Sequence, residues 1–478
     1  MSTPRPDTHL PAIHPRPPRN WINDPNGLTF HDGHYHVFYQ HNPNGPDHTG
    51  IHWGHHRSTD LVTWEELPVA LAPTPGGDDA DGCFSGNAVS DGDRLLAFYS
   101  AYRTDRWWQP IAAAESADGG LTWRKHPGLV VPTPPEGTSM YRDPYVWRQG
   151  DRWRMLVGAS VTGERGAALL YESSDLADWR YLGPFFTDGA GEEGWTGWEC
   201  PQYATFGDRG VLVVSLWDAV AGPRSTRVYV GGEQDGRFAS TGHRPLDHGP
   251  DFYAPALLHA PDGRRLLWGW SWEARDQQWS REAGWAGVLT VPRELSLAED
   301  GTVRQQPATE VLGYRGRKVV HATGWSAGED PGSADLGAVG TAFDLTARLR
   351  PRTDAPCGLR LETAPGEHLD IVVDPVAGEL VVDRDHASLD TRARKGRYPV
   401  PLSGREGPVD FRVVVDGSIV EVFLDSGESS TLRWYPTGPA PWRLRTFGGP
   451  DHIVDVWELD AGERPVAFGH DELHTAAN

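Results

Sequence analysis

The sequence predicts an all-β protein, a five-bladed β-propeller followed by a C-terminal β-sandwich. Three observations predict this fold: a series of five short motifs, a second series of turn motifs with the same spacing, and a final third of the chain in which both series stop. The markers of the first series recur every 53 to 60 residues and are Asp24, Phe84, Asp143, Glu199 and Phe252. Repeats of this length indicate one supersecondary unit copied around an axis.

The second series has the form Ser-x-Asp followed by Trp. It occurs at Ser58–Trp64, Ser116–Trp123 and Ser173–Trp179, and its aspartates are 57 to 58 residues apart. Asp and Gly at these positions favour tight turns, and the following Trp is expected to begin or end an outer strand. Two independent series with one period strengthen the case for a repeated unit.

Short runs rich in β-branched and aromatic residues follow each motif at roughly a dozen residues. They are Tyr35–Gln40, Leu95–Tyr99, Trp153–Gly158, Val211–Leu216 and Leu266–Trp270. A motif strand, a turn and further strands within one period make a four-stranded propeller blade. Five markers predict five blades in residues 1–305, which form the catalytic domain together with an irregular N-terminal arm.

The chain beyond the last motif predicts a second domain. Residues 306–316 are expected to be a linker with one helical turn after Pro307, and residues 317–478 are expected to be a β-sandwich. Its clearest signal is Asp416-Gly417 between the apolar runs Phe411–Val415 and Ile419–Leu424, which predicts a hairpin.

Composition limits the function classes. The net charge of −22 argues against nucleic acid as a partner. The sequence contains no run of 18 apolar residues, so no membrane span is expected. The segment Met1–Asn20 lacks the apolar core of a secretory signal, and three cysteines far apart form no disulfide framework. We therefore expect a cytoplasmic protein. Its 21 tryptophans offer flat apolar faces that suit sugar rings as well as blade cores.

Three of the five motifs carry an acid, and the period places Asp24, Asp143 and Glu199 at equivalent positions near the axis. Carboxylates that converge repel one another, so the arrangement is costly unless the protein uses it. Taken singly, each has an ordinary structural explanation: Asn23–Gly27 reads as a turn, Arg142-Asp143-Pro144 as a local ion pair, and Glu199 as a rim residue. Taken together and in register, they favour a catalytic site.

The motifs in this order resemble glycoside hydrolase family 32, the β-fructofuranosidases, over nearly the whole chain. The resemblance rests on Trp21–Leu28, Tyr39–Pro43, His52–His55, Phe84–Gly86, Arg142–Pro144, Glu199–Pro201, Asp251–Pro255, Gly284–Gly287, Pro292–Leu295 and Val420–Phe423. It implies the propeller and sandwich already predicted. It also implies Asp24 as nucleophile, Glu199 as general acid/base, and Asp143 as the carboxylate that holds fructose hydroxyls and stabilises the transition state.

The chemistry agrees with these implied roles. Cleavage through an oxocarbenium-like state needs a proton for the leaving oxygen and negative charge near the anomeric carbon. Glu199 lies between Trp198 and Cys200, an apolar setting that suits the acid. Asp24 lies among Asn23, Asn26 and turn amides that can donate hydrogen bonds. For a retaining mechanism the two carboxyl groups are expected about 5–5.5 Å apart.

The resemblance also implies the substrate pocket. Its expected residues are Trp21, Asn23, Gln40, Trp53, Phe84, Ser85, Arg142, Asp251, Tyr253 and Trp285. Arg142 is expected to fix Asp143 and donate to a sugar hydroxyl. Asp251 and Tyr253 are expected to contact the sugar beyond the scissile bond, and Trp285 is either a wall or a core residue. No metal and no cofactor are expected, although histidines such as His34 and His36 crowd the first blade.

These observations predict a retaining, exo-acting hydrolase that releases β-D-fructose from sucrose and short fructo-oligosaccharides. The alternatives are a fructan exohydrolase acting on levan or inulin, a fructosyltransferase on the same site, and a sucrose-6-phosphate hydrolase. A non-catalytic sugar-binding propeller is a further alternative, which the presence of all three acids disfavours. The expected partner is a small sugar, and the chain is expected to be a monomer or homodimer.

Overall fold

The structure is a computed structural model that describes residues 7–162, 165–187, 197–324, 332–402 and 407–462. These residues fold into strands numbered β1 to β34 in chain order. Within them there is one α-helix, α1 (Gln277–Ala283), and one 3-10 helix, η1 (Thr309–Tyr314). No described helix is long and apolar enough to cross a membrane. The all-β class that the sequence predicts is confirmed.

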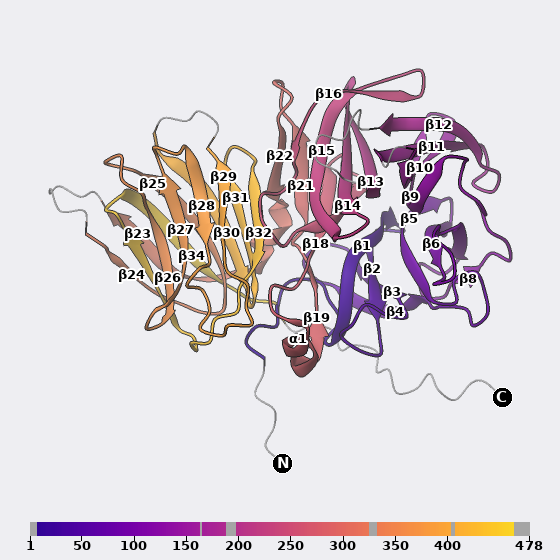
Figure 1. Cartoon of the computed structure of the whole chain (residues 1–478). Coiled ribbons are helices and arrows are strands. Elements are labelled where there is room, and N and C mark those ends of the chain that lie inside the picture. Colours follow the sequence, from indigo (N-terminus) through magenta and orange to yellow (C-terminus); the bar gives the residue numbers. More distant parts are fainter. Residues whose placement is uncertain (1–6, 163–164, 188–196, 325–331, 403–406, 463–478) are drawn as a thin grey trace, which may run out of the picture.

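The first two thirds of the described chain forms five sheets, each begun by a strand that carries one of the five motifs (Figure 1). The first contains β1 (Asn20–His31), β2 (His34–Asn42), β3 (His52–Ser58) and β4 (Glu65–Leu71). The second contains β5 (Gly82–Asp91), β6 (Arg94–Tyr102), β7 (Ile111–Ser116) and β8 (Arg124–Lys125). The third contains β9 (Thr138–Gln149), β10 (Arg152–Val161), β11 (Arg165–Ser173) and β12 (Arg180–Thr187).

The fourth sheet contains β13 (Gly197–Phe206), β14 (Arg209–Asp218), β15 (Gly222–Gln234) and β16 (Arg237–Pro245). The fifth contains β17 (Tyr253–His259), β18 (Arg265–Ser271), β20 (Val288–Leu289), β21 (Arg293–Leu297) and β22 (Val303–Pro307). Between β18 and β20 the chain forms α1 and then β19 (Trp285–Ala286), which pairs in parallel with the start of β1. A strand from within the chain segment of the fifth sheet thus pairs with the first sheet.

The first strands of the five sheets surround a common centre. β1, β5, β9, β13 and β17 contact one another in this order, and β17 contacts β1. Motif residues that are far apart in the sequence are therefore brought together.

Each of these first strands has a bulge at its motif. The residues that the ladder skips are Asn23-Asp24, Phe84-Ser85, Asp143, Cys200-Pro201 and Ala254-Pro255. Three bulges hold a non-glycine residue in the left-handed region, with φ of 62° at Asp143, 47° at Cys200 and 44° at Ala254. A bulge frees a residue from the ladder and re-aims its side chain. The bulges therefore turn the motif side chains towards the common centre.

The second motif series forms the predicted turns. In the first of them Ser58 Oγ accepts from Leu61 N at 2.8 Å, and Asp60 Oδ1 accepts from Thr63 N at 2.6 Å. The turn at Ser173–Trp179 has the same hydrogen bonds, from Leu176 N and Asp178 N. Each tryptophan of the series directly precedes an outer strand, β4, β8 or β12.

The last third of the described chain forms two six-stranded sheets that pack face to face around an apolar core, at one side of the five smaller sheets (Figure 1). One contains β23 (Arg315–Gly324), β34 (Asp451–Leu459), β25 (Ala342–Arg350), β30 (Val409–Asp416), β31 (Ile419–Leu424) and β32 (Ser429–Arg433). The other contains β24 (Asp335–Val339), β33 (Trp442–Phe447), β26 (Cys357–Ala364), β27 (Glu367–Asp374), β28 (Glu379–Asp383) and β29 (Arg397–Pro401).

The predicted local signals in this region are present. The hairpin between β30 and β31 turns directly after Asp416, with Gly417 at φ 57°. The connection from β22 to β23 contains η1, the helical turn expected after Pro307.

A buried ionic network joins the fifth sheet to the sandwich. Arg293 on β21 is completely buried and pairs with Asp247 at 2.9 Å and with Glu421 on β31 at 2.5 Å. Arg293 Nη2 also donates to the hydroxyl of Thr431 on β32. A buried charge is stable only when it is paired and hydrogen-bonded, so the two regions are held in one register at this point.

The N-terminal arm adds a second connection through His14, which is buried between two carboxylates. Its Nδ1 lies 2.7 Å from Asp416 Oδ2, and its Nε2 lies 3.0 Å from Glu421 Oε1. Burial opposes a charge on His14, but the hydrogen bonds to Asp416 and Glu421 outweigh it and raise its pKa from 6.5 to about 9. The protonated imidazole thus clamps the arm to the sandwich.

This clamp predicts a loss of stability in alkali. Because the folded-state pKa of His14 lies above its unfolded value, its contribution is complete below pH 6.5 and disappears as pH rises through about 9. We expect His14→Gln to lower the free energy of unfolding by roughly 1–3 kcal/mol near pH 6. Urea titrations from pH 6 to 10 should show that the gap in the free energy of unfolding between the intact protein and His14→Gln becomes smaller as pH rises.

The control is His321→Gln, because His321 is exposed and pairs with Asp455 at the surface. It should leave the free energy of unfolding unchanged at every pH. A gap for His14→Gln that is equally large at pH 6 and pH 10 would show that His14 stabilises the fold without its charge.

Candidate active site

Asp24 lies in the bulge of β1, and three side-chain donors surround its carboxylate. Asn23 Nδ2 donates to Oδ1 at 3.0 Å, and Ser85 Oγ donates to Oδ2 at 2.6 Å. Gln40 Nε2 lies 3.3 Å from Oδ2 and also donates to Ser85. Hydrogen-bond donors arranged in this way compensate a negative charge on the carboxylate. Three of the expected pocket residues therefore meet at Asp24.

Asp143 lies in the bulge of β9 and is buried. Its backbone N–H donates to Ser100 Oγ at 2.7 Å, which fixes the left-handed conformation of the bulge. The backbone N–H of Cys200 donates to Asp143 Oδ2 at 3.0 Å. The carboxylate is thus held by a main-chain group of the fourth sheet, and the backbone of Asp143 is held by a side chain of the second sheet.

Glu199, on β13, is held by one phenol and one guanidinium. Tyr253 Oη donates to Glu199 Oε2 at 2.7 Å, and Arg142 Nη1 lies 3.2 Å from Glu199 Oε1. The guanidinium of Arg142 also lies over the ring of Trp217, 5.2 Å from its centroid. The expectation that Arg142 fixes Asp143 needs correction, because the ion pair that it forms is with Glu199 across the site.

Burial and mutual repulsion perturb these acids. Burial raises the pKa of Asp143, and the negative charges of Glu199 and Asp24 raise it further, while Arg142 opposes the rise. Burial also raises the pKa of Glu199, against the lowering effects of Arg142 and the Tyr253 hydrogen bond. Carboxyl groups whose pKa is raised hold a proton more readily, which favours general acid catalysis.

Cys200 is a site residue that was not among the expected ones. Its Sγ lies 3.7 Å from Asp24 Oδ2 and 3.6 Å from Asp143 Oδ2, so the thiol separates the two carboxylates. Burial raises the pKa of the thiol well above its usual value, which keeps it a neutral weak donor. The signal in the sequence is its position directly after Glu199, inside the same motif.

Aromatic rings flank the acids. Phe84 stacks on Tyr102 with centroids 4.2 Å apart, and Trp21 Nε1 donates to Asn23 Oδ1 at 2.6 Å. Trp53 is completely buried and donates to the carbonyl of Phe84 at 3.0 Å, so it supports the wall from behind.

The structure does not bring two of the expected residues to the acids. Asp251 is completely buried, pairs with Arg384 of the sandwich and accepts from the backbone N–H of Arg433 at 2.8 Å. Trp285 is 2% exposed, and the guanidinium carbon of Arg275 lies over the Trp285 ring, 4.2 Å from the ring centroid. Both residues belong to the contact between the fifth sheet and the sandwich.

A cavity of about 440 Å³ borders this cluster. It is lined by Trp21 and His48 from the first sheet, by Trp270 and Trp272 from the fifth, and by Arg394 from the sandwich. Trp272 stacks on Tyr253 with centroids 5.3 Å apart, and Tyr253 in turn holds Glu199. The cavity therefore lies on the Glu199 side of the acids.

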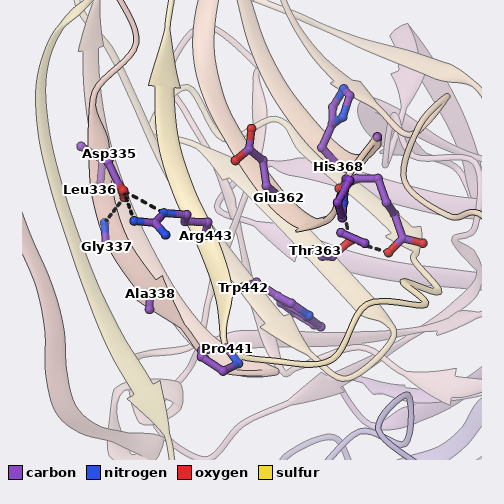
Figure 2. Close-up of a pocket in the computed structure, with 14 residues that line it drawn as sticks. Asp335, Leu336, Gly337, Ala338, Glu362, Thr363, His368, Pro441, Trp442 and Arg443 are labelled. Carbon is purple, nitrogen blue, oxygen red and sulfur yellow. Dashed lines mark hydrogen bonds and ion pairs between the residues drawn. The ribbon is translucent and has the colours of Figure 1, made fainter.

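A larger hollow, of about 830 Å³, lies on the sandwich. Figure 2 shows its side chains. Arg443 is turned towards Asp335, with which it forms an ion pair, and the hydroxyl of Thr363 donates a hydrogen bond to Glu367. Its buried carboxylate, Glu367, already accepts from Thr363 Oγ1 and from the backbone of Thr437 and Gly438. The carboxylates that line this hollow are therefore already paired or hydrogen-bonded.

The crowded histidines of the first sheet are packed internally. His36 Nδ1 lies 2.9 Å from His55 Nε2, and Phe38 stacks on His55 with centroids 3.9 Å apart. Across residues 7–462, apart from the gaps given above, no group of three or more His, Cys, Asp or Glu side chains is arranged to hold a metal ion.

Comparison with known proteins gives the class. A family model described as Glycosyl hydrolases family 32 N-terminal domain matches residues 14–307, and the model of the family 32 C terminal matches residues 310–456. The sucrose-6-phosphate hydrolase of Escherichia coli is 35% identical over 453 residues, which cover 90% of each chain. The raffinose invertase of Escherichia coli is 34% identical over 462 residues, which cover 91% of each.

A solved structure has a similar fold. The GH32 beta-fructofuranosidase of Bombyx mori superposes with a TM-score of 0.77 at 26% identity, over 95% of this chain and 94% of that one. The family models and the relatives thus define a glycoside hydrolase. The chain belongs to glycoside hydrolase family 32.

The Tyr253 hydrogen bond predicts a pKa change. Because this bond favours the ionised form of Glu199, Tyr253→Phe should raise the pKa of Glu199 while the ring keeps its stacking on Trp272. Carbon-13 NMR titration of glutamate-labelled protein should show the resonance of Glu199, assigned with Glu199→Gln, titrating at higher pH.

Tyr171→Phe is the control, because Tyr171 is a buried phenol that accepts from Tyr141 Oη, away from the acids. It should leave the Glu199 titration in place. An unchanged or lowered pKa of Glu199 in Tyr253→Phe would mean that the phenol does not act on the acid.

Proposed function

We propose that this chain is a retaining, exo-acting β-fructofuranosidase that releases β-D-fructose from sucrose and short fructo-oligosaccharides. The relatives support this substrate class, because sucrose and raffinose, which their names mention, both carry a terminal β-linked fructofuranosyl unit. The observation that carries the proposal is the meeting of three carboxyl groups with unlike hydrogen-bond partners around one centre.

In this proposal Asp24 is the nucleophile. It attacks the anomeric carbon of the fructosyl unit, and its donors Asn23, Gln40 and Ser85 orient it for the attack. Glu199 gives a proton to the leaving oxygen and then takes one from water, the exchange that a retaining mechanism requires. Burial raises its pKa, which favours the protonated form that a general acid needs.

Asp143 and the flanking side chains are proposed to bind the fructosyl unit. Asp143 accepts from the sugar hydroxyls, and Arg142 balances the charge of the site through Glu199. Trp21 and Phe84 form the walls, with Trp53 behind Phe84. The leaving group is placed on the side of Glu199, where Trp272, which stacks on Tyr253, borders the cavity.

The proposed architecture follows the same division. The chain up to the end of β22 forms a five-bladed propeller with its N-terminal arm, the segment around η1 is the linker, and the sandwich begins with β23. The five sheets whose first strands contact one another around a centre support the five blades. A cytoplasmic location, with no cofactor required, completes the proposal.

The test is the release of fructose from sucrose, raffinose, 1-kestose, inulin and levan by the intact protein. Glu199→Gln should lower kcat by about 10²–10⁴-fold, the range for loss of a general acid. Asp24→Asn should lower kcat by roughly 10⁴-fold or more, because no covalent step remains. Glu172→Gln, on the outer part of the third sheet where Glu172 pairs with Arg180, should keep full activity.

The kestose-like products formed at high sucrose measure transfer against hydrolysis. Free fructose in excess over such products is expected. Full turnover by Glu199→Gln, or no release from any fructoside by the intact protein, would overturn the assignment.

A further inference from the structure

The loop between β2 and β3 packs on the aromatic side chains that flank the acids and on β1 itself. The ring of His48, which belongs to this loop, lies 5.6 Å from the ring of Trp21 and 5.3 Å from the ring of Phe84, measured between centroids. The carbonyl of Gly45 accepts from the backbone N–H of Trp21 at 3.0 Å. The conformation of this loop therefore acts on β1 close to the bulge that holds Asp24.

The dipeptide Asn44-Gly45 lies in an open part of this loop. Asn44 is exposed and stands in a turn, where its backbone N–H donates to Asn42 Oδ1 at 2.9 Å. Among the described residues, the side-chain amide of Asn44 and the N–H of Gly45 have no hydrogen-bond partner. Apart from its chain neighbours, no atom lies within 4 Å of the place that a Cβ on Gly45 would take. A glycine with open space around it can bring its nitrogen to the preceding side chain.

An asparagine placed in this way reacts with its own main chain, and asparagine is a thermolabile residue for this reason. Hydroxide removes the proton of the Gly45 nitrogen, the nitrogen attacks Cγ of Asn44, and the side-chain amide leaves as ammonia. Water then opens the resulting five-membered imide. Opening at Cγ gives an ordinary aspartate, and opening at the backbone carbonyl gives isoaspartate, whose main chain runs through Cβ and Cγ. Each event consumes one water and releases one ammonia, without an oxidant.

A second Asn-Gly pair, Asn26-Gly27, has the opposite surroundings. Asn26 is 1% exposed, and both residues lie within β1. A Cβ on Gly27 would stand 2.6 Å from the ring of Phe38 and 3.0 Å from the ring of Trp53. Close packing of this kind leaves the main chain no room to turn its nitrogen towards the side chain. The same dipeptide thus stands in an open turn at one place and in a packed strand at the other.

We propose that Asn44-Gly45 is a site of spontaneous deamidation and that its isoaspartate product lowers the activity of the enzyme. Isoaspartate lengthens the main chain by one carbon directly before Gly45, which displaces the Gly45 carbonyl from the N–H of Trp21. The displacement reaches the nucleophile because Trp21 Nε1 donates to Asn23 Oδ1, and Asn23 Nδ2 donates to Asp24. The ordinary aspartate product keeps the length of the main chain and leaves the bond to Trp21 in place. The effect on activity rests on the proposed function, and the chemical change does not.

The test follows the intact protein during storage at pH 8 by peptide mass spectrometry, with fragmentation that separates Asn44 from Asn26. Asn44 should gain one dalton and yield both aspartate and isoaspartate, while Asn26 stays unchanged. In guanidinium chloride, which unfolds β1, both asparagines should change at similar rates. No change at Asn44, or equal change at both asparagines in the folded protein, would overturn the proposal.

Gly45→Ala is the variant that slows the reaction and keeps both the asparagine and the charge. The space around Gly45 admits a methyl group, and the methyl group restricts the approach of the nitrogen to Asn44. Deamidation and the loss of sucrose hydrolysis during storage should both be several-fold slower than in the intact protein. Gly128→Ala is the matched control, because Gly128 is exposed with equally open surroundings but follows a proline. It should lose activity at the rate of the intact protein, and equal rates in all three proteins would contradict the proposal.

Repair separates the effect of isoaspartate from slow unfolding. Protein-isoaspartate methyltransferase with S-adenosylmethionine esterifies the isoaspartate, the Gly45 nitrogen expels methanol to re-form the imide, and water returns part of it to aspartate. Aged intact protein should regain activity on this treatment, and fresh Asn44→Asp should be as active as fresh intact protein. Full activity of protein that carries isoaspartate, no recovery after repair, or an inactive Asn44→Asp would overturn the effect on activity.

The proposed function fails separately, by absence of fructose release from every fructoside. In that case the mass measurements still decide whether Asn44-Gly45 deamidates. Calorimetric binding of fructose to fresh, aged and repaired protein then decides whether isoaspartate alters the site. Binding that weakens with age and recovers on repair supports the proposal, and equal binding by all three contradicts it.

Discussion

Repulsion among three carboxyl groups is the constraint on which the rest of the structure depends. Asp24, Asp143 and Glu199 approach one another because each lies on a first strand that contacts its neighbours around one centre. The protein offsets the repulsion differently for each: side-chain donors at Asp24, a backbone N–H at Asp143, and a guanidinium with a phenol at Glu199. The three acids therefore have unlike hydrogen-bond environments, and unlike environments are what acid and nucleophile roles require.

The sandwich braces this arrangement through buried ion pairs. Arg293 connects the fifth sheet to Glu421, Arg384 connects the sandwich to Asp251, and His14 joins the N-terminal arm to Asp416 and Glu421. Removing one partner from such a pair leaves an unpaired buried charge, which is strongly destabilising. The fifth sheet carries Tyr253 and Trp272, so the brace also positions the wall next to Glu199.

The period of the motifs was enough to predict the all-β class, the five first strands and the three acids, because a repeated spacing reflects a repeated unit. The partners of Asp24 were also within reach, since Asn23 is adjacent and Gln40 lies on the paired strand β2. Other contacts depend on the approach of separate sheets, which spacing does not encode. Arg142 therefore reaches Glu199 instead of Asp143, and Cys200 enters between two acids.

The same limit explains the two residues that lie elsewhere. Asp251 and Trp285 stand in motifs that resemble the family's, but the sandwich packs on them and buries both. Their partners, Arg384 and Arg433 for Asp251, come from the last third of the chain, more than 130 residues away. The central claim, that Asp24 forms a covalent intermediate, is tested most directly by the anomer formed when sucrose is cleaved in aqueous methanol. Methyl β-D-fructofuranoside is predicted, because two displacements retain the configuration. Methyl α-D-fructofuranoside as the first product would contradict the account.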